Sequence, residues 1–234
     1  MIATRNIEPC VSFISSQIRY ANESGGVAEN SVRRTVTISR QTGCGAFLVA
    51  EKLAHFLQEH SPKDPSPWTV FDRDLIDKVL ADHDLPHYLA KFLPEDRVPR
   101  VEDFLDEIFD VYPPSRTIVL QTAETMLKLA AMGHVILIGR GGNLVTSRLP
   151  NVFHVRLVAP FEKRVELAHT QYNMTKTEAH KFCLREDRGR ARYLKKYFNA
   201  DINDPLFYHM VINTGQMDFD ATAKIIGEAV LKLH

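Results

Sequence analysis

The chain has no excess of charge of either sign. In 234 residues, 29 Lys and Arg are matched by 29 Asp and Glu. This balance argues against nucleic acid or an anionic membrane as the main partner, because both select basic chains. A balanced total still allows a local basic patch.

Cysteines are few and widely separated. Cys10, Cys44 and Cys183 show no CxxC spacing, which excludes a disulfide framework or a zinc site and favours a reducing, cytoplasmic setting. The ten histidines show no HExxH or His-x-His spacing, so the sequence predicts no metal centre built from protein side chains.

Long apolar runs are also missing. The apolar runs, such as Val135 to Ile138, are far shorter than a membrane span. No apolar stretch follows a basic start at the N-terminus, so we expect no signal peptide. The hydrophobic content of 44% is nevertheless enough for a sizeable core.

The pattern divides the chain into residues 1–34 and 35–234. Within the first part, Val11, Ile14 and Ile18 recur at helical spacing. We interpret this part as a partly helical extension that packs on the main domain or on a second subunit, which allows a homodimer.

Strands alternate with helices from Thr35 onward. The expected strands are residues 35–39, 68–71, 134–139, 152–158 and 208–213, and helices are expected at residues 46–57, 72–93, 101–109, 115–132, 161–198 and 220–233. Such alternation predicts an α/β fold, a five-stranded parallel sheet with helices on both faces.

A glycine loop, Gly43-Cys44-Gly45, joins the first strand to the first helix. Glycines allow close approach of the backbone, and free N–H groups at a helix start attract anions. We therefore place the phosphates of ATP on residues Thr42 to Phe47. The alternative is a simple tight turn, because Gly-x-Gly alone is a weak signal. Cys44 is interpreted as a small loop residue whose thiol pKa the helix start would lower.

The full phosphate-loop motif GxxxxGK[ST] is absent. Arg40 stands at its first glycine, Ala46 at its lysine and Phe47 at its Ser/Thr. The loop thus lacks the lysine that contacts the β- and γ-phosphates and the hydroxyl that holds Mg²⁺. Arg40, at the end of the first strand, is a candidate phosphate ligand.

Four segments resemble the cytidylate-kinase-like family in order and spacing. They are Ile38-Ser-Arg-Gln-Thr-Gly-Cys-Gly45, Phe71-Asp-Arg-Asp-Leu-Ile76, Ile138-Gly-Arg-Gly-Gly142 with the following Pro150-Asn-Val and Val155-Arg-Leu-Val-Ala-Pro160, and Asp187-Arg188 with Arg192-Tyr193, Asp204-Pro205 and residues 208–214. The resemblance extends from residue 35 to about 230. It implies a three-layer P-loop kinase fold with a helical lid at about residues 173–200. It also implies phosphoryl transfer from ATP, with Mg²⁺, to a nucleoside monophosphate, and CMP or dCMP is the first acceptor that we expect.

The lid region concentrates positive charge. On a helix, Arg185, Arg188 and Arg192 fall at i, i+3 and i+7 and share one face. Three guanidiniums there suit a catalytic role on the migrating phosphoryl group. The alternative is a solvated helix face with local ion pairs.

Two strand ends carry the acceptor candidates, because ligands of open parallel sheets bind beyond the carboxyl ends of strands. Arg140 and Gly141 follow the third expected strand, and the resemblance assigns Arg140 to the acceptor nucleotide. Asp72 and Arg73 follow the second, and Asp72 is also a candidate for orienting Mg²⁺ through water. Asp187 joins this acceptor group from the lid. The structural alternatives are an ion pair for Arg140 and a helix N-cap for Asp72.

The leading hypothesis is an ATP-dependent nucleoside-monophosphate kinase. A nucleotide-binding regulatory protein without useful catalysis is the second, motivated by Ala46 and Phe47. A kinase of another small acceptor is the third, since fold does not fix substrate.

Overall fold

The fold is that of a computed structural model, which describes Phe13 and residues 33–61, 66–72 and 116–233. The expected helix at residues 101–109, all of the one at residues 72–93 except Asp72, and nearly all of the 1–34 extension lie outside these described residues, as does Arg73. The division at residue 34 therefore stays a prediction.

A five-stranded, all-parallel sheet forms the centre, in the order β2-β3-β1-β4-β5. The strands are β1 (Thr35–Arg40), β2 (Thr69–Phe71), β3 (Val135–Ile138), β4 (Val152–Val158) and β5 (Met210–Asn213). All four residues of β3 are buried, as its apolar run predicts for a strand covered on both faces. The expected α/β class and sheet are confirmed.

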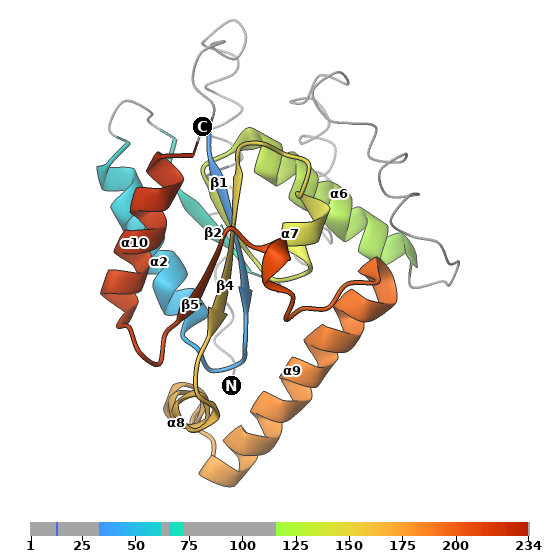
Figure 1. Cartoon of the computed structure of the whole chain (residues 1–234), viewed down its shortest axis with the longest axis vertical. Helices are drawn as coiled ribbons and strands as arrows, with labels where there is room; N and C mark the ends of the chain where they lie inside the picture. Colours follow the sequence, from blue (N-terminus) through green and yellow to red (C-terminus); the bar gives the residue numbers. More distant parts are fainter. Residues whose placement is uncertain (1–12, 14–32, 62–65, 73–115, 234) are drawn as a thin grey trace, which may run out of the picture.

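One face of the sheet is covered by α2 (Ala46–Glu59) and α10 (Phe219–Leu231), which lie together in Figure 1. Val49, Leu53 and Leu57 of α2 are fully buried in this layer. Each such side chain contributes about 1.5–3 kcal/mol relative to an exposed one. The two helices approach closely, because a Cβ on Gly227 of α10 would lie 2.2 Å from the Phe56 ring.

The other face is covered by α6 (Arg116–Met132) and the short α7 (Gly142–Val145). Met126, Leu129 and Ala130 of α6 pack there with Leu137 of β3, and Phe13 belongs to the same cluster. Helices on both faces complete the three layers that the sequence predicts.

Two further helices follow β4 and extend beyond the sheet (Figure 1). They are α8 (Phe161–Tyr172) and α9 (Lys176–Phe198), in place of the single helical region expected at residues 161–198. The break has a local cause. Asn173 ends α8 in the left-handed conformation, and Thr175 with Glu178 forms a capping box that starts α9.

Short segments complete the chain, including the 3-10 turn η1 (Pro205–Phe207) before β5. The remaining expected elements agree with the structure to within two residues at their described ends, a normal difference for helix and strand boundaries. In the described part of the chain, no helix is both long and apolar enough to cross a bilayer.

Candidate functional site

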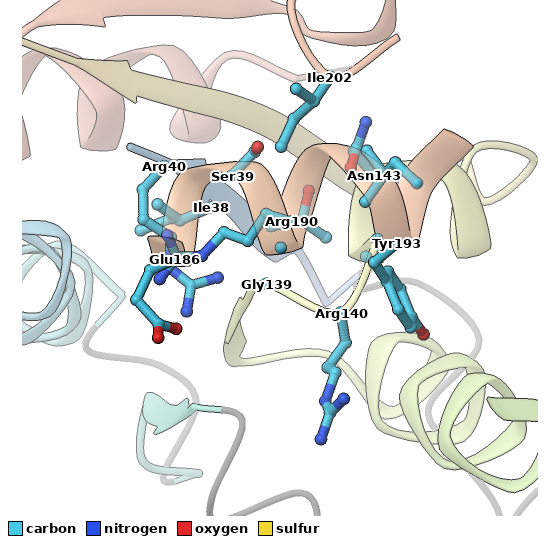
Figure 2. Close-up of a pocket in the computed structure, with 15 residues that line it drawn as sticks. Ile38, Ser39, Arg40, Gly139, Arg140, Asn143, Glu186, Arg190, Tyr193 and Ile202 are labelled. Atoms are coloured by element: carbon cyan, nitrogen blue, oxygen red, sulfur yellow. The ribbon is translucent and has the colours of Figure 1, made fainter. Parts of the chain in front are cut away.

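A cavity of about 260 Å³ lies beyond the carboxyl ends of β1 and β3, under α9 (Figure 2). The parallel register pairs Ile38 with Ile138, so the residues that follow each strand emerge side by side. The polar lining of the cavity includes Ser39, Arg40, Arg140, Asn143, Glu186 and Arg190, and Tyr193 is among the apolar lining groups. This is the position at which open parallel sheets bind ligands.

The turn after β3 has an unusual backbone. Gly139, Arg140 and Gly141 all have positive φ, at 91°, 53° and 72°. Arg140 holds a conformation that residues other than glycine rarely adopt, and such conformations concentrate at functional sites. The turn presents Arg140 to the cavity, and its side chain extends away from those of Arg40 and Arg190 in Figure 2.

Arg40 crosses the end of β3 because Gly139 has no side chain. A Cβ on Gly139 would lie 2.0 Å from Nη1 of Arg40. Burial, and secondarily the charge of Arg190, lowers the pKa of Arg40 to about 10. The guanidinium therefore stays charged at neutral pH, and an anion between Arg40 and Arg190 would relieve their repulsion.

The glycine loop leads into α2 with an open helix start. Gly43 and Gly45 have φ of 79° and 75°, and Gly45 is the N-cap residue of α2 without a side-chain hydrogen bond. The first turn of α2 carries no acidic residue. The positive end of the helix dipole is thus left for another anion, as the loop motif predicts.

Close packing also explains the two glycines. A Cβ on Gly43 would lie 2.2 Å from the carbonyl oxygen of Arg164, and one on Gly45 would lie 2.4 Å from the ring of Phe219. The loop is therefore wedged between α8 and α10, and substitution of either glycine would disturb it whether or not a nucleotide binds.

Cys44 corrects one expectation. Burial raises the pKa of its thiol to about 11, whereas the helix start was expected to lower it. Cys44 is 2% exposed, and its thiol donates to the carbonyl of Gln41. Desolvation outweighs the helix dipole here, and the thiol has the character of a small structural group.

The three arginines predicted to share a face of the lid do not line the cavity. Arg185, Arg188 and Arg192 are exposed on α9. The face of α9 that meets the cavity instead carries Glu186 and Arg190.

Arg190 is the functional candidate that the sequence reasoning missed as a site residue. It precedes Tyr193 and Leu194 by three and four positions, and these apolar residues also line the cavity. Helical spacing places Arg190 on the same face as this pair, but basic residues around the whole helix leave no periodicity that singles out this face from the sequence.

Asp187 contacts the glycine loop directly. One carboxylate oxygen accepts from the backbone N and the hydroxyl of Thr42, both at 2.7 Å. The other oxygen accepts from Nη1 of Arg164 at 2.7 Å. Arg190 also donates to this carboxylate, at 3.1 Å.

Comparison with known proteins adds to this geometry. The model of the cytidylate kinase-like family matches residues 35–216, which is more than half of the chain. The chain belongs to the cytidylate kinase-like family. Membership implies that nucleotides bind to the fold described above.

Two curated relatives and one solved structure show how distant the similarities are. The cytidylate kinase of Methanocaldococcus jannaschii is 23% identical over 158 residues, covering 66% of this chain and 89% of that protein. A uronate isomerase of Corynebacterium glutamicum is 28% identical over 114 residues, which are 49% of this chain; the chain spans only 22% of that isomerase. An uncharacterized protein from Eubacterium ventriosum has a similar structure, with TM-score 0.63, 18% identity, and coverage of 85% of this chain and 98% of that one. This last similarity concerns the fold alone.

For a member of this family, the fit of Mg²⁺ is a further question. Among the described residues, no group of three His, Cys, Asp or Glu side chains is arranged to hold a metal ion. Mg²⁺ usually keeps several waters and binds through substrate phosphates and one or two carboxylates. Asp72, at the end of β2, is close enough to Arg40 for its negative charge to favour the charged form of Arg40. Asp72 is a described carboxylate at a strand end that fits this limited role.

Proposed function

We propose that the protein transfers the γ-phosphoryl group of ATP to a nucleoside monophosphate, with CMP or dCMP as the first acceptor to test. The supporting observation is the juxtaposition of an uncapped glycine loop with a cavity that carries Arg40, Arg140 and Arg190. A phosphoryl transfer between two anions requires such concentrated positive charge. Family membership and the similarity to a cytidylate kinase point the same way.

In this proposal the loop holds the donor. The backbone of residues Thr42 to Phe47 surrounds the ATP phosphates at the start of α2, and Cys44 and Ala46 contribute main-chain groups only. The loop itself supplies no lysine side chain, because Ala46 occupies that position. Arg40 supplies a fixed positive charge next to the loop.

The cavity holds the acceptor. Arg140 and Gly141 bind its phosphate, Asp72 contacts it from the end of β2, and Arg190 does so from α9. The acceptor phosphate oxygen then attacks the γ-phosphorus in line, the bond to the β-phosphate oxygen breaks, and ADP leaves. Mg²⁺ would arrive with ATP, and Asp72 would orient it through water.

The exposed arginines of α9 act in a closed state. Arg185, Arg188 and Arg192 reach the migrating phosphoryl group only if α9 changes position, as expected for a lid that excludes water. This separates their catalytic role from the binding role of Arg190.

The test is a direct assay. Purified protein is incubated with Mg-ATP and a panel of nucleoside monophosphates, and ADP and each diphosphate are followed by chromatography. Formation of CDP or dCDP is the expected result. Diphosphate formed from other bases would correct the acceptor, and no acceptor-dependent loss of ATP would overturn the kinase proposal.

A nucleotide-binding regulatory protein is the second candidate, because Ala46 and Phe47 replace the lysine and hydroxyl of the phosphate loop. It predicts measurable affinity for ATP without any diphosphate product. The same assay, combined with ATP titration by calorimetry, separates the two candidates.

A further inference from the structure

The carboxylate of Asp187 connects two parts of the molecule that the chain separates widely. It lies in the middle of α9, yet it bonds to Thr42, 145 positions away in the glycine loop. Its Oδ1 accepts both the backbone N–H and the hydroxyl of Thr42. A carboxylate that accepts several hydrogen bonds is a strong and directional anchor.

Arg164 completes the anchor from α8. Its guanidinium donates to the carbonyl of Ala159 at 3.0 Å, to the carbonyl of Thr42 at 3.2 Å and to Asp187 at 2.7 Å. Both the N–H and the carbonyl of Thr42 are therefore held by this ion pair. The next residue, Gly43, packs directly on the backbone of Arg164.

Arg190 links the same anchor to the cavity. It donates to the Thr42 hydroxyl and to Asp187, and it also lines the cavity. One carboxylate thus orients the loop on one side and a cavity guanidinium on the other.

The ion pair itself adds little to the stability of the fold, because its charges lose hydration when they are buried. Arg164 is 6% exposed and the Asp187 side chain is 27% exposed, and an ion pair removed from water is often no more stabilising than apolar residues of similar volume. Removal of one partner is different, because the buried charge left behind is then uncompensated. The pair makes more sense as a device that sets geometry.

We propose that Asp187 and Arg164 are positioning residues that set the conformation of the glycine loop from α9 and α8, respectively. This inference rests on the proposed function in assigning the ATP phosphates to that loop. Docking of α9 and ordering of the loop are then one equilibrium. By linkage, whatever undocks Asp187 weakens phosphate binding, and a phosphate on the loop favours docking of α9.

The chain offers a matched control for this proposal. Glu166 of α8 pairs with Lys176 of α9 at 2.7 Å, so it also joins the two helices through a carboxylate. Both members of this pair are largely exposed, and neither belongs to the loop. Glu166→Gln and Asp187→Asn each remove one negative charge from the same helix pair. In Asp187→Asn the new amide nitrogen must also face a guanidinium, donor against donor.

Two measurements test the proposal. Hydrogen exchange followed by mass spectrometry reports on the peptide that contains Thr42 to Gly45, and calorimetry gives the Kd for ATP. For Asp187→Asn we expect loop exchange at least tenfold faster and a Kd for ATP at least tenfold higher, with exchange in β3 and α10 unchanged. Glu166→Gln should match the wild type in both. Equal loop exchange in the two variants overturns the proposal.

The outcomes also separate this proposal from the proposed function. If the wild type binds no ATP, the kinase proposal fails, while loop exchange still decides the role of Asp187. If Asp187→Asn does not fold, Thr42→Val removes only the hydroxyl that Asp187 and Arg190 share. A severalfold rise in loop exchange in Thr42→Val supports the anchor, and wild-type exchange overturns it.

Discussion

Gly189 lies within α9, on the face that lines the cavity. A Cβ at this position meets no atom within 4 Å. Glycine inside a helix costs about 0.5–1 kcal/mol relative to alanine, so its retention here has a cost that packing does not explain.

We expect Gly189→Ala to raise the free energy of unfolding by about 0.5–1 kcal/mol and, at the same time, to weaken acceptor binding, because the added methyl group occupies cavity space. Urea unfolding and the KM for the acceptor measure the two effects. Ala191→Gly provides the inverse change in the same helix. A stabilised Gly189→Ala with unchanged KM would mean that the acceptor does not approach this face.

Cys44 yields a second prediction at this scale. With its pKa raised to about 11 by burial, almost no thiolate exists at pH 8. Iodoacetamide should therefore leave the Cys44 peptide unmodified in the native protein and modify it after denaturation, as read by mass spectrometry. Rapid labelling of that peptide in the native protein would contradict this prediction and support the lowered thiol pKa that a helix start favours.

Within α9, opposite faces of one helix carry different proposed roles. Arg190 lines the cavity in this structure, while Arg188 is exposed. A group that already contacts the acceptor contributes to its binding, and a group that arrives on closure contributes to the transition state alone.

Arg190→Ala is therefore expected to raise the acceptor KM at least tenfold. Arg188→Ala is expected to lower kcat by orders of magnitude with little change in KM, through lost charge stabilisation. Steady-state kinetics with each substrate varied separately measures both. Unchanged turnover in Arg188→Ala would remove Arg188 from the mechanism and leave α9 without the expected lid motion.

For the molecule as a whole, His154 links stability to pH. It is buried in β4, where its ring contacts Thr37 at 2.8 Å and lies 5.0 Å from the ring of His209. Burial first, and His209 second, lower its pKa from 6.5 to about 4. The unfolded chain thus binds a proton that the folded chain does not, between these two values.

The contribution of His154 is fully present above pH 6.5 and is lost as pH falls toward 4. Over that window we expect the free energy of unfolding to fall by up to about 3 kcal/mol. Urea unfolding between pH 4 and 7 measures this slope, and His154→Gln should flatten it. The same slope in the variant would assign the pH dependence to other groups.

The fold was predictable because its signals are local. The apolar run of β3, the β-branched residues of β1 and the glycine loop each indicate an element within a few residues. The alternation of strands and helices then implies a parallel sheet. The break between α8 and α9 was missed although its capping residues, Asn173 and Thr175, are visible in the sequence.

The candidate site was predictable only in part. Arg40, Arg140 and Gly141 were found because strand ends mark ligand positions in parallel sheets, and the structure brings them to one cavity. Their roles in binding stay predictions. Asp187 was placed with the acceptor, whereas the structure shows it bonded to the loop.

Neighbouring residues are enough to predict the order of the elements, the glycine loop without its lysine and the family. Which face of α9 meets the cavity and which carboxylate reaches Thr42 depend on contacts between distant parts of the chain. Charged residues surround α9 on most sides, so periodicity cannot choose a face. That choice came from the packing of Tyr193 and Leu194 toward the sheet and from the ion pair with Arg164, contacts between residues far apart in the chain.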